Sequence, residues 1–185
     1  MLSFVLTVLL VTQTEVAPEA AATGGGRILV VYYSRTGTTQ QVAEALAGEL
    51  EADIEQIQDV RARSGLFGLI RSGYEATRKI LPAIKPVTRD PSEYGLVILG
   101  TPVWAGTMSS PMRSYITAHA AQFNSIALFS THGGDDEGRT FQDMVALCGK
   151  PPVATLSLKH EAVVQDDYEE KFVEFVTAIR AETGQ

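Results

Sequence analysis

The chain of 185 residues is 45% hydrophobic and 20% charged, which is typical of a globular domain with its own apolar core. Its formal net charge of −7 argues against nucleic acid and anionic membrane surfaces as partners. The single cysteine, Cys148, excludes an intrachain disulfide framework, a cysteine-rich zinc site and a Cys-x-x-Cys redox pair. Any redox chemistry would therefore need a bound cofactor.

Residues 1–25 are predicted to lie outside the folded domain, which would comprise residues 26–185. A secretory signal peptide would explain the apolar run Leu2–Val11 and the alanines Ala20–Ala22 near a cleavage point. No Lys or Arg precedes that run, so an over-extended start is an equal alternative. The run is also shorter than the roughly 20 apolar residues that span a bilayer. We expect a cytoplasmic protein, or an exported one if the signal is real, with no stable membrane insertion of the folded domain.

The first predicted strand is Ile28–Tyr33, an unbroken β-branched and aromatic run of the kind that is buried on both faces of a parallel sheet. A helix is predicted from Thr39 to Glu51. Between them lie hydroxyl side chains around Gly37, and such a strand–loop–helix unit directs free backbone N–H groups at one point. That point suits a phosphate, although Ser and Thr also favour an ordinary helix N-cap. The hydroxyl residues are Ser34, Thr36, Thr38 and Thr39.

The composition of this loop narrows the class of phosphate site. Arg35 is its one cation, and the loop lacks both the lysine of a Walker-type loop and the Gly-x-Gly-x-x-Gly dinucleotide fingerprint. With these two classes of phosphate site excluded, the loop is expected to bind one terminal phosphate monoester. The motif Ser-x-Thr-Gly-x-Thr, which follows the first buried strand, resembles the phosphate loop of the flavodoxin family, which holds the phosphate of FMN. The resemblance implies FMN contacts from Ser34, Arg35, Thr36, Gly37, Thr38 and Thr39.

A modest strand is predicted over Ala52–Gln58, followed by a helix from Ser64 to Pro82. Its apolar residues recur at helical spacings among arginines and a lysine, and they are Leu66, Phe67, Leu69, Ile70, Tyr74 and Ile80. The pattern favours a helix that covers the sheet, and a basic amphipathic helix at a membrane surface is the alternative.

The next strand, Leu96–Gly100, is apolar throughout and should be central in the sheet. The loop after it would lie at the carboxyl edge, where open α/β sheets bind ligands. We expect Trp104 to be exposed there and to stack on a flat ring such as an isoalloxazine, with burial in the core as the alternative. The loop also resembles the second flavin-contacting loop of flavodoxin-like proteins. Its candidate residues are Thr101, Pro102, Val103, Trp104, Ala105 and Gly106.

A helix over Met108–Ala121 and a strand over Ser125–Thr131 lead to a third loop at the same predicted edge. Its position matches the third flavin loop of the family. His132 could stack on the ring or hydrogen-bond it, and a solvated histidine is the alternative. The acids Asp135, Asp136 and Glu137 would lower the reduction potential of a nearby flavin, or else form a solvated turn. The candidate cofactor residues are Thr131, His132, Gly133, Gly134 and Asp135.

A helix over Thr140–Cys148, a strand over Val153–Leu158 and a helix over Asp166–Ala181 complete the pattern. Five strands alternate strictly with five helices, which predicts an α/β, three-layer, doubly wound sandwich. The flavodoxin resemblance covers Arg27 to about Ala181. It implies a five-stranded parallel sheet with strand order 2-1-3-4-5.

Two functional classes follow from the flavin interpretation. The protein would be a flavodoxin-type electron carrier that acts between redox partner proteins, or an NAD(P)H-dependent oxidoreductase that reduces a quinone or similar small acceptor. The third loop lacks the aromatic residue common in short-chain carriers, which would leave one ring face open. In either class the flavin carries the chemistry, so no catalytic acid or base is expected. A flavodoxin-fold binding protein without redox activity is a third alternative.

Overall fold

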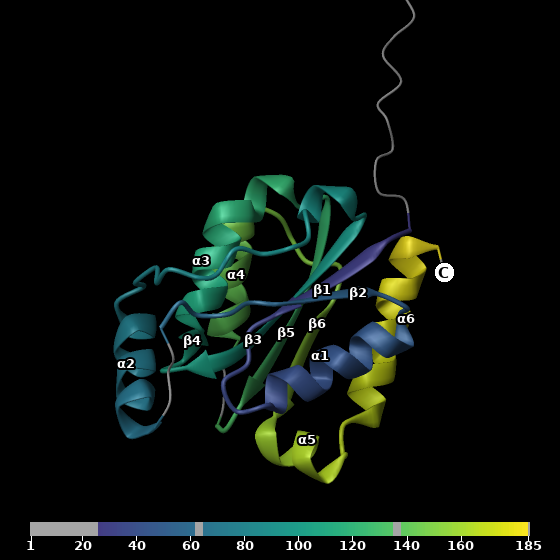
Figure 1. Ribbon diagram of the computed structural model, residues 1–185. Helices are drawn as coiled ribbons and strands as arrows, with labels where there is room; N and C mark the ends of the chain where they lie inside the picture. The colour runs from purple at the N-terminus through teal and green to yellow at the C-terminus, as the bar shows by residue number, and fades with distance from the viewer. Residues whose placement is uncertain (1–25, 62–64, 135–137, 185) are drawn as a thin grey trace, which may run out of the picture.

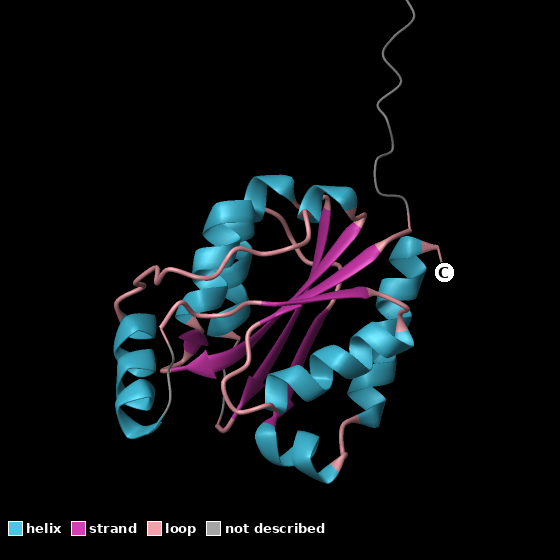
Figure 2. Ribbon diagram, viewed as in Figure 1, coloured by secondary structure: helices cyan, strands magenta, loops and turns pink. Residues whose placement is uncertain are grey.

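A computed structural model describes residues 26–61, 65–134 and 138–184. The predictions for residues 1–25 and for Asp135, Asp136 and Glu137 lie outside these ranges. Within them the chain folds into three layers, with one sheet between two layers of helices (Figures 1 and 2). The predicted α/β doubly wound architecture is confirmed.

The helices and strands alternate as expected, with two additions. A two-residue strand and a short helix, β4 and α5, were not predicted. The strands are β1 (Ile28–Tyr32), β2 (Asp53–Gln56), β3 (Leu96–Trp104), β4 (Thr107–Met108), β5 (Ser125–His132) and β6 (Thr155–Lys159). The helices are α1 (Thr38–Glu49), α2 (Gly65–Thr77), α3 (Ser110–His119), α4 (Arg139–Cys148), α5 (His160–Gln165) and α6 (Glu169–Thr183), with single 3₁₀ turns at Pro91–Glu93 and Ala120–Gln122.

The parallel strands follow the order β2-β1-β3-β5-β6, and β4 pairs antiparallel with the end of β3. When the parallel strands alone are numbered along the chain, without β4, this is the predicted strand order 2-1-3-4-5. Tyr32 of β1 lies opposite Gly100 of β3, which in turn lies opposite Phe129 of β5. Because these strands are parallel and in register, their carboxyl ends lie at one edge of the sheet.

Residues of β1 alternate between two apolar cores. Leu29 and Val31 face α3 and α4, whereas Val30 and Tyr32 face α1 and α6. Figure 1 shows these helix pairs on opposite faces of the sheet. Every residue of β1 is buried, which explains why this strand is an unbroken apolar run in the sequence.

The segment Thr101–Gly106, predicted as a loop, is instead the end of β3 and the turn of a hairpin. β3 continues past Gly100 to Trp104, which pairs with Thr107 of β4. The turn residues Ala105 and Gly106 have φ angles of 50° and 75°. Two successive positive φ angles match the right-handed twist of a tight hairpin, and glycine accepts such an angle without strain.

Helix α2 leaves exposed two residues of the apolar face that was predicted for it. Ile70 and Tyr74 are 61% and 58% exposed, whereas Glu75 and Ala76 are buried. Ile80 lies beyond the end of the helix, at Thr77. None of the helices in the described ranges is long and apolar enough to cross a membrane.

An ion pair between a buried arginine and a half-buried aspartate attaches the hairpin to the helices behind it. Arg113 of α3, whose side chain is 5% exposed, donates from Nη2 to Oδ2 of Asp143 on α4 at 2.9 Å and to Oγ1 of Thr107 at 3.0 Å. Thr107 also donates to Oδ2 of Asp143 at 2.5 Å. Burial alone would raise the pKa of Asp143, but the hydrogen bonds from Thr107 and Arg113 hold it below its usual value. We call this group the hairpin clamp.

Replacing Gly100 with Ala should destabilise the sheet, because the added Cβ would lie 2.0 Å from Cζ of Phe129 on the neighbouring strand. We expect a loss of about 2 kcal/mol in the free energy of unfolding, measured by urea denaturation. The control is Gly48→Ala in α1, where an added Cβ meets nothing within 4 Å and should be neutral or stabilising. Equal stability of the Gly100 variant and the wild type would contradict the close packing of β3 against β5.

Replacing Asp143 with Asn should cost about 3 kcal/mol at neutral pH, because the buried charge of Arg113 loses its counter-ion. Because the pKa of Asp143 is lower in the folded protein than in the unfolded chain, its ionised form stabilises the fold. This stabilisation is fully present when the pH is above the ordinary pKa of aspartate, and it is lost as the pH falls through the folded-state pKa. The difference between wild type and variant should therefore narrow below about pH 4 in denaturation experiments. Lys79→Gln, which removes the exposed partner of Asp143, should cost less than about 1 kcal/mol. A constant difference at all pH values would contradict this account.

Candidate cofactor site

A cavity of about 260 Å³ lies at the carboxyl edge of the central strands. It is formed where the segments that follow β1, end β3 and end β5 meet, together with the first residue of α5. We call it the cofactor cavity. The predicted residues that line it are Arg35, Thr36, Thr38, Thr39, Pro102, Val103, Trp104, Thr131, His132 and Gly133, and His160 joins them.

The first segment has the geometry of an anion cradle. Gly37, with φ of 98°, is the N-cap of α1, and its N–H donates to Oγ of Ser34 at 3.1 Å. Ser34 and Gly37 thus shape the loop without lining the cavity. The N–H groups of the first helical turn, starting at Thr38, have no acceptors within the helix and carry the positive end of its dipole. Thr36 is exposed and Arg35 is half-buried at this end of the cavity.

A buried hydrogen bond ties the first segment to the third. The hydroxyl groups of Thr39 and Thr131 lie 2.7 Å apart, and both side chains are almost fully buried. Although Thr39 lines the cavity, its hydroxyl already has a partner within the protein. Thr39 therefore fixes the relative position of two walls of the site.

In the second segment, the expectation that Trp104 is exposed is wrong. Trp104 is 9% exposed and belongs to the same apolar cluster as Met108 and Met144. Its ring meets that of Tyr33 edge-on, with centroids 5.4 Å apart and planes at 87°. The hairpin turn directly after Trp104 explains its burial, because strand pairing holds the residue against the core. Trp104 still lines the cavity, beside the half-buried Pro102 and Val103.

Other residues of the predicted second segment lie away from the cavity. Thr101 is fully buried, and its Oγ1 both donates to Oγ of Ser109 and accepts from the Ser109 N–H, each at 3.0 Å. Ala105 and Gly106 form the hairpin turn and do not line the cavity.

In the third segment, His132 and Gly133 line the cavity and Gly134 does not. Nδ1 of His132 donates to the carbonyl oxygen of Gly134, since a carbonyl can only accept. The His132 ring is thus held by its own loop at the cavity wall. Asp135, the last predicted residue of this segment, lies outside the described residues.

The sequence analysis missed His160. Its Nδ1 lies 2.9 Å from Oγ1 of Thr38, so α5 begins next to the start of α1. Its position in the chain could have revealed it, because His160 directly follows the end of the last strand, β6. Residues there lie at the same sheet edge as the three predicted segments.

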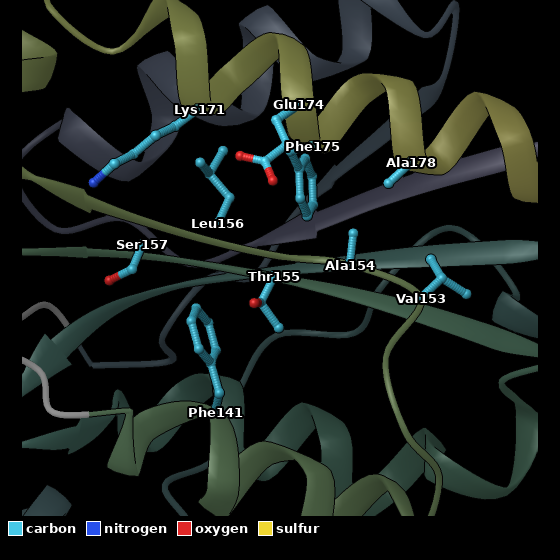
Figure 3. Close-up of a pocket in the computed structure, with 10 residues that line it drawn as sticks. All are labelled: Phe141, Val153, Ala154, Thr155, Leu156, Ser157, Lys171, Glu174, Phe175 and Ala178. Carbon is cyan, nitrogen blue, oxygen red and sulfur yellow. The ribbon is translucent and has the colours of Figure 1, made fainter.

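Two larger cavities lie nearby in the described structure. One, of about 450 Å³, shares His132 with the cofactor cavity and extends past Lys159 to Asp166, Tyr168 and Lys171. We call it the adjoining cavity. The other, of about 510 Å³, lies along β6 between Phe141 of α4 and the side chains of α6 (Figure 3). It includes none of the predicted site residues.

The donors and walls of the cofactor cavity fit a phosphorylated ring compound. One end offers hydroxyl groups, helix N–H groups and a guanidinium, which suit a phosphate monoester. Another wall consists of Pro102, Val103 and Trp104, which suit a flat apolar ring. The described residues contain no cluster of His, Cys, Asp and Glu that could hold a metal ion.

Several solved structures share this fold at low sequence identity. A flavoprotein from Lactobacillus acidophilus, crystallised in complex with FMN, is 17% identical, with a TM-score of 0.62 over 76% of this chain and 97% of its own. A WrbA-like flavodoxin from Agrobacterium tumefaciens is 19% identical, with a TM-score of 0.54 over 84% and 98%. The apo form of the NADH:FMN oxidoreductase EmoB is 10% identical, with a TM-score of 0.53 over 85% and 88%.

No curated protein sequence matches the chain. The sequence model described as Flavodoxin, however, matches residues 27–175, which include all four parts of the cofactor cavity. This range also spans most of the region in which the flavodoxin resemblance was noted. The chain therefore belongs to the flavodoxin family.

Proposed function

We propose that this protein transfers electrons through FMN held in the cofactor cavity. The observation that carries the proposal is the convergence of three segments on one cavity with a polar end and an apolar wall. Two of these segments are joined by a hydrogen bond between residues 92 positions apart in the chain. Bound FMN would supply the redox chemistry, as it accepts and releases electrons at its ring system. The task of the protein is to hold and shield the cofactor.

Each segment has a distinct role in that task. Thr36, Thr38 and the first N–H groups of α1 would hold the phosphate, with Arg35 as a cation nearby. Pro102, Val103 and the edge of Trp104 would contact the ring system. Thr131 would act indirectly, since its hydrogen bond with Thr39 holds the first and third segments together.

A second candidate is an NAD(P)H-dependent oxidoreductase, and two observations favour it. The adjoining cavity, of about 450 Å³, meets the cofactor cavity at His132 and could admit a second molecule. Because Trp104 is packed into the core and His132 is followed by two glycines, the described walls would leave one face of a bound ring open. The likeness of the fold to an NADH:FMN oxidoreductase is compatible with this candidate.

Replacing Thr36 with Ala should weaken FMN binding about tenfold, because it removes an exposed hydroxyl from the phosphate end of the cavity. The affinity can be measured by quenching of flavin fluorescence as FMN is added to the full-chain apoprotein. Thr177→Ala is the matched control, since Thr177 is an exposed threonine on α6 whose hydroxyl donates to the carbonyl of Val173. Equal FMN affinities of the wild type, Thr36→Ala and Thr177→Ala would show that the Thr36 hydroxyl does not contribute to FMN binding. Failure of the wild type to bind FMN would refute the proposed function.

Anaerobic stopped-flow mixing of the FMN-loaded protein with NADPH or NADH separates the two candidates. For an electron carrier we expect no direct bleaching of the flavin on a scale of seconds, whereas dithionite should bleach it at once. Dithionite serves as the control that the bound flavin can be reduced. Rapid bleaching by either nicotinamide would instead establish the oxidoreductase.

A further inference from the structure

His160 lies at the phosphate end of the cofactor cavity but belongs to none of the three predicted segments. It is exposed, it lines the cavity with Arg35 and Thr36, and its Nδ1 is 2.9 Å from Oγ1 of Thr38. Because α5 starts immediately after β6, the imidazole is placed by the sheet rather than by a long loop. An ionisable group that can carry a positive charge therefore lines this cavity in addition to Arg35.

The hydrogen bond between His160 and Thr38 depends on protonation. When the imidazole is neutral and its Nδ1 accepts a hydrogen bond, the Thr38 hydroxyl donates its single proton to Nδ1. It then has no proton to donate to a phosphate. In the imidazolium form both ring nitrogens carry protons, so Nδ1 must donate to Oγ1 of Thr38. The Thr38 hydroxyl can then donate to a phosphate oxygen, and the ring adds a positive charge near that phosphate.

The surrounding charges favour an anion at this place. No acidic residue lies in the first turn of α1, and the nearest acid of that helix, Glu44, accepts a hydrogen bond from Gln40 at 2.7 Å. The other charged or titratable described residues that line the two cavities here or belong to α5 are Arg35, His132, Lys159, Glu161, Asp166, Asp167, Tyr168, Glu169, Glu170 and Lys171. Among these, Arg35 and His132 line the cofactor cavity with His160, and none of the acids does.

We propose that His160 is a phosphate-binding residue of the FMN site and that its protonated form holds the cofactor phosphate together with Thr38. The proposal rests on the proposed function, since FMN supplies the phosphate. A dianionic phosphate stabilises the imidazolium relative to the neutral ring, so FMN binding is coupled to the uptake of a proton. The affinity for FMN then falls as pH rises, and the cofactor is held most tightly in mildly acidic conditions.

The test is an FMN titration of the full-chain apoprotein between about pH 6.5 and 8.5, where the phosphate is mostly a dianion. The wild type should lose up to about tenfold in affinity per pH unit. His160→Gln, which is neutral at all pH values, should bind FMN about tenfold more weakly at the acidic end and show little pH dependence. His160→Arg should keep high affinity across the range, because its charge is permanent.

Two controls separate a phosphate contact from a general effect of the substitution. His119→Gln, at the last residue of α3 and outside the cofactor cavity, should keep the wild-type pH dependence. Riboflavin, which has no phosphate, should bind the wild type and His160→Gln equally well. Calorimetry in two buffers with different ionisation heats should detect proton uptake on FMN binding by the wild type and less of it by His160→Gln.

The outcomes distinguish this inference from the proposed function. If His160→Gln matches the wild type in both pH dependence and proton uptake while FMN still binds, the role of His160 is overturned and the FMN site stands. A loss of riboflavin binding equal to the loss of FMN binding would also overturn it, because the effect would not depend on the phosphate. If the wild type binds no FMN at any pH, the proposed function fails and this inference fails with it.

Discussion

The central strands of this protein are buried on both faces, and that constraint decides where chemistry can take place. All five residues of β1 and the first six residues of β3 are buried, so neither strand has room for an unpaired polar group along those stretches. Polar side chains must therefore gather beyond the strand ends. Because β1, β3 and β5 are parallel and in register, these ends meet at one edge, and the cofactor cavity lies there.

Hydrogen bonds between segments far apart in the chain give the polar end of the cavity its shape. The buried pair of Thr39 and Thr131 joins the start of α1 to the end of β5, and a buried hydroxyl without a partner would be unfavourable, so each holds the other in place. Thr38 and His160 join α1 to α5 at the surface of the same site. A phosphate bound at this end would meet donors that the protein has already positioned, which lowers the entropy lost on binding.

The apolar wall of the cavity is held in a different way. The hairpin that carries Trp104 is anchored through Thr101 and Ser109 at its base and through the hairpin clamp at Thr107. Burying a guanidinium such as that of Arg113 is unfavourable unless a carboxylate pairs with it, and Asp143 does so at 2.9 Å. The position of the ring wall thus depends on α3 and α4 as well as on the sheet, which makes Trp104 a fixed part of the wall rather than a mobile platform.

The apolar runs Ile28–Tyr33 and Leu96–Gly100 were sufficient to place these two strands at the centre of a parallel sheet, because such runs are buried on both faces. The strand order 2-1-3-4-5 came from the resemblance to the flavodoxin family. The sequence did not reveal β4, whose two residues are too few to form a recognisable pattern. Nor did it indicate that Trp104 is buried, since that depends on what the hairpin packs against. The contact between Thr38 and His160 joins residues 122 positions apart. Local patterns determined the elements and their order, and only tertiary packing decided which side chains meet at the sheet edge, because those distances depend on how the whole chain folds.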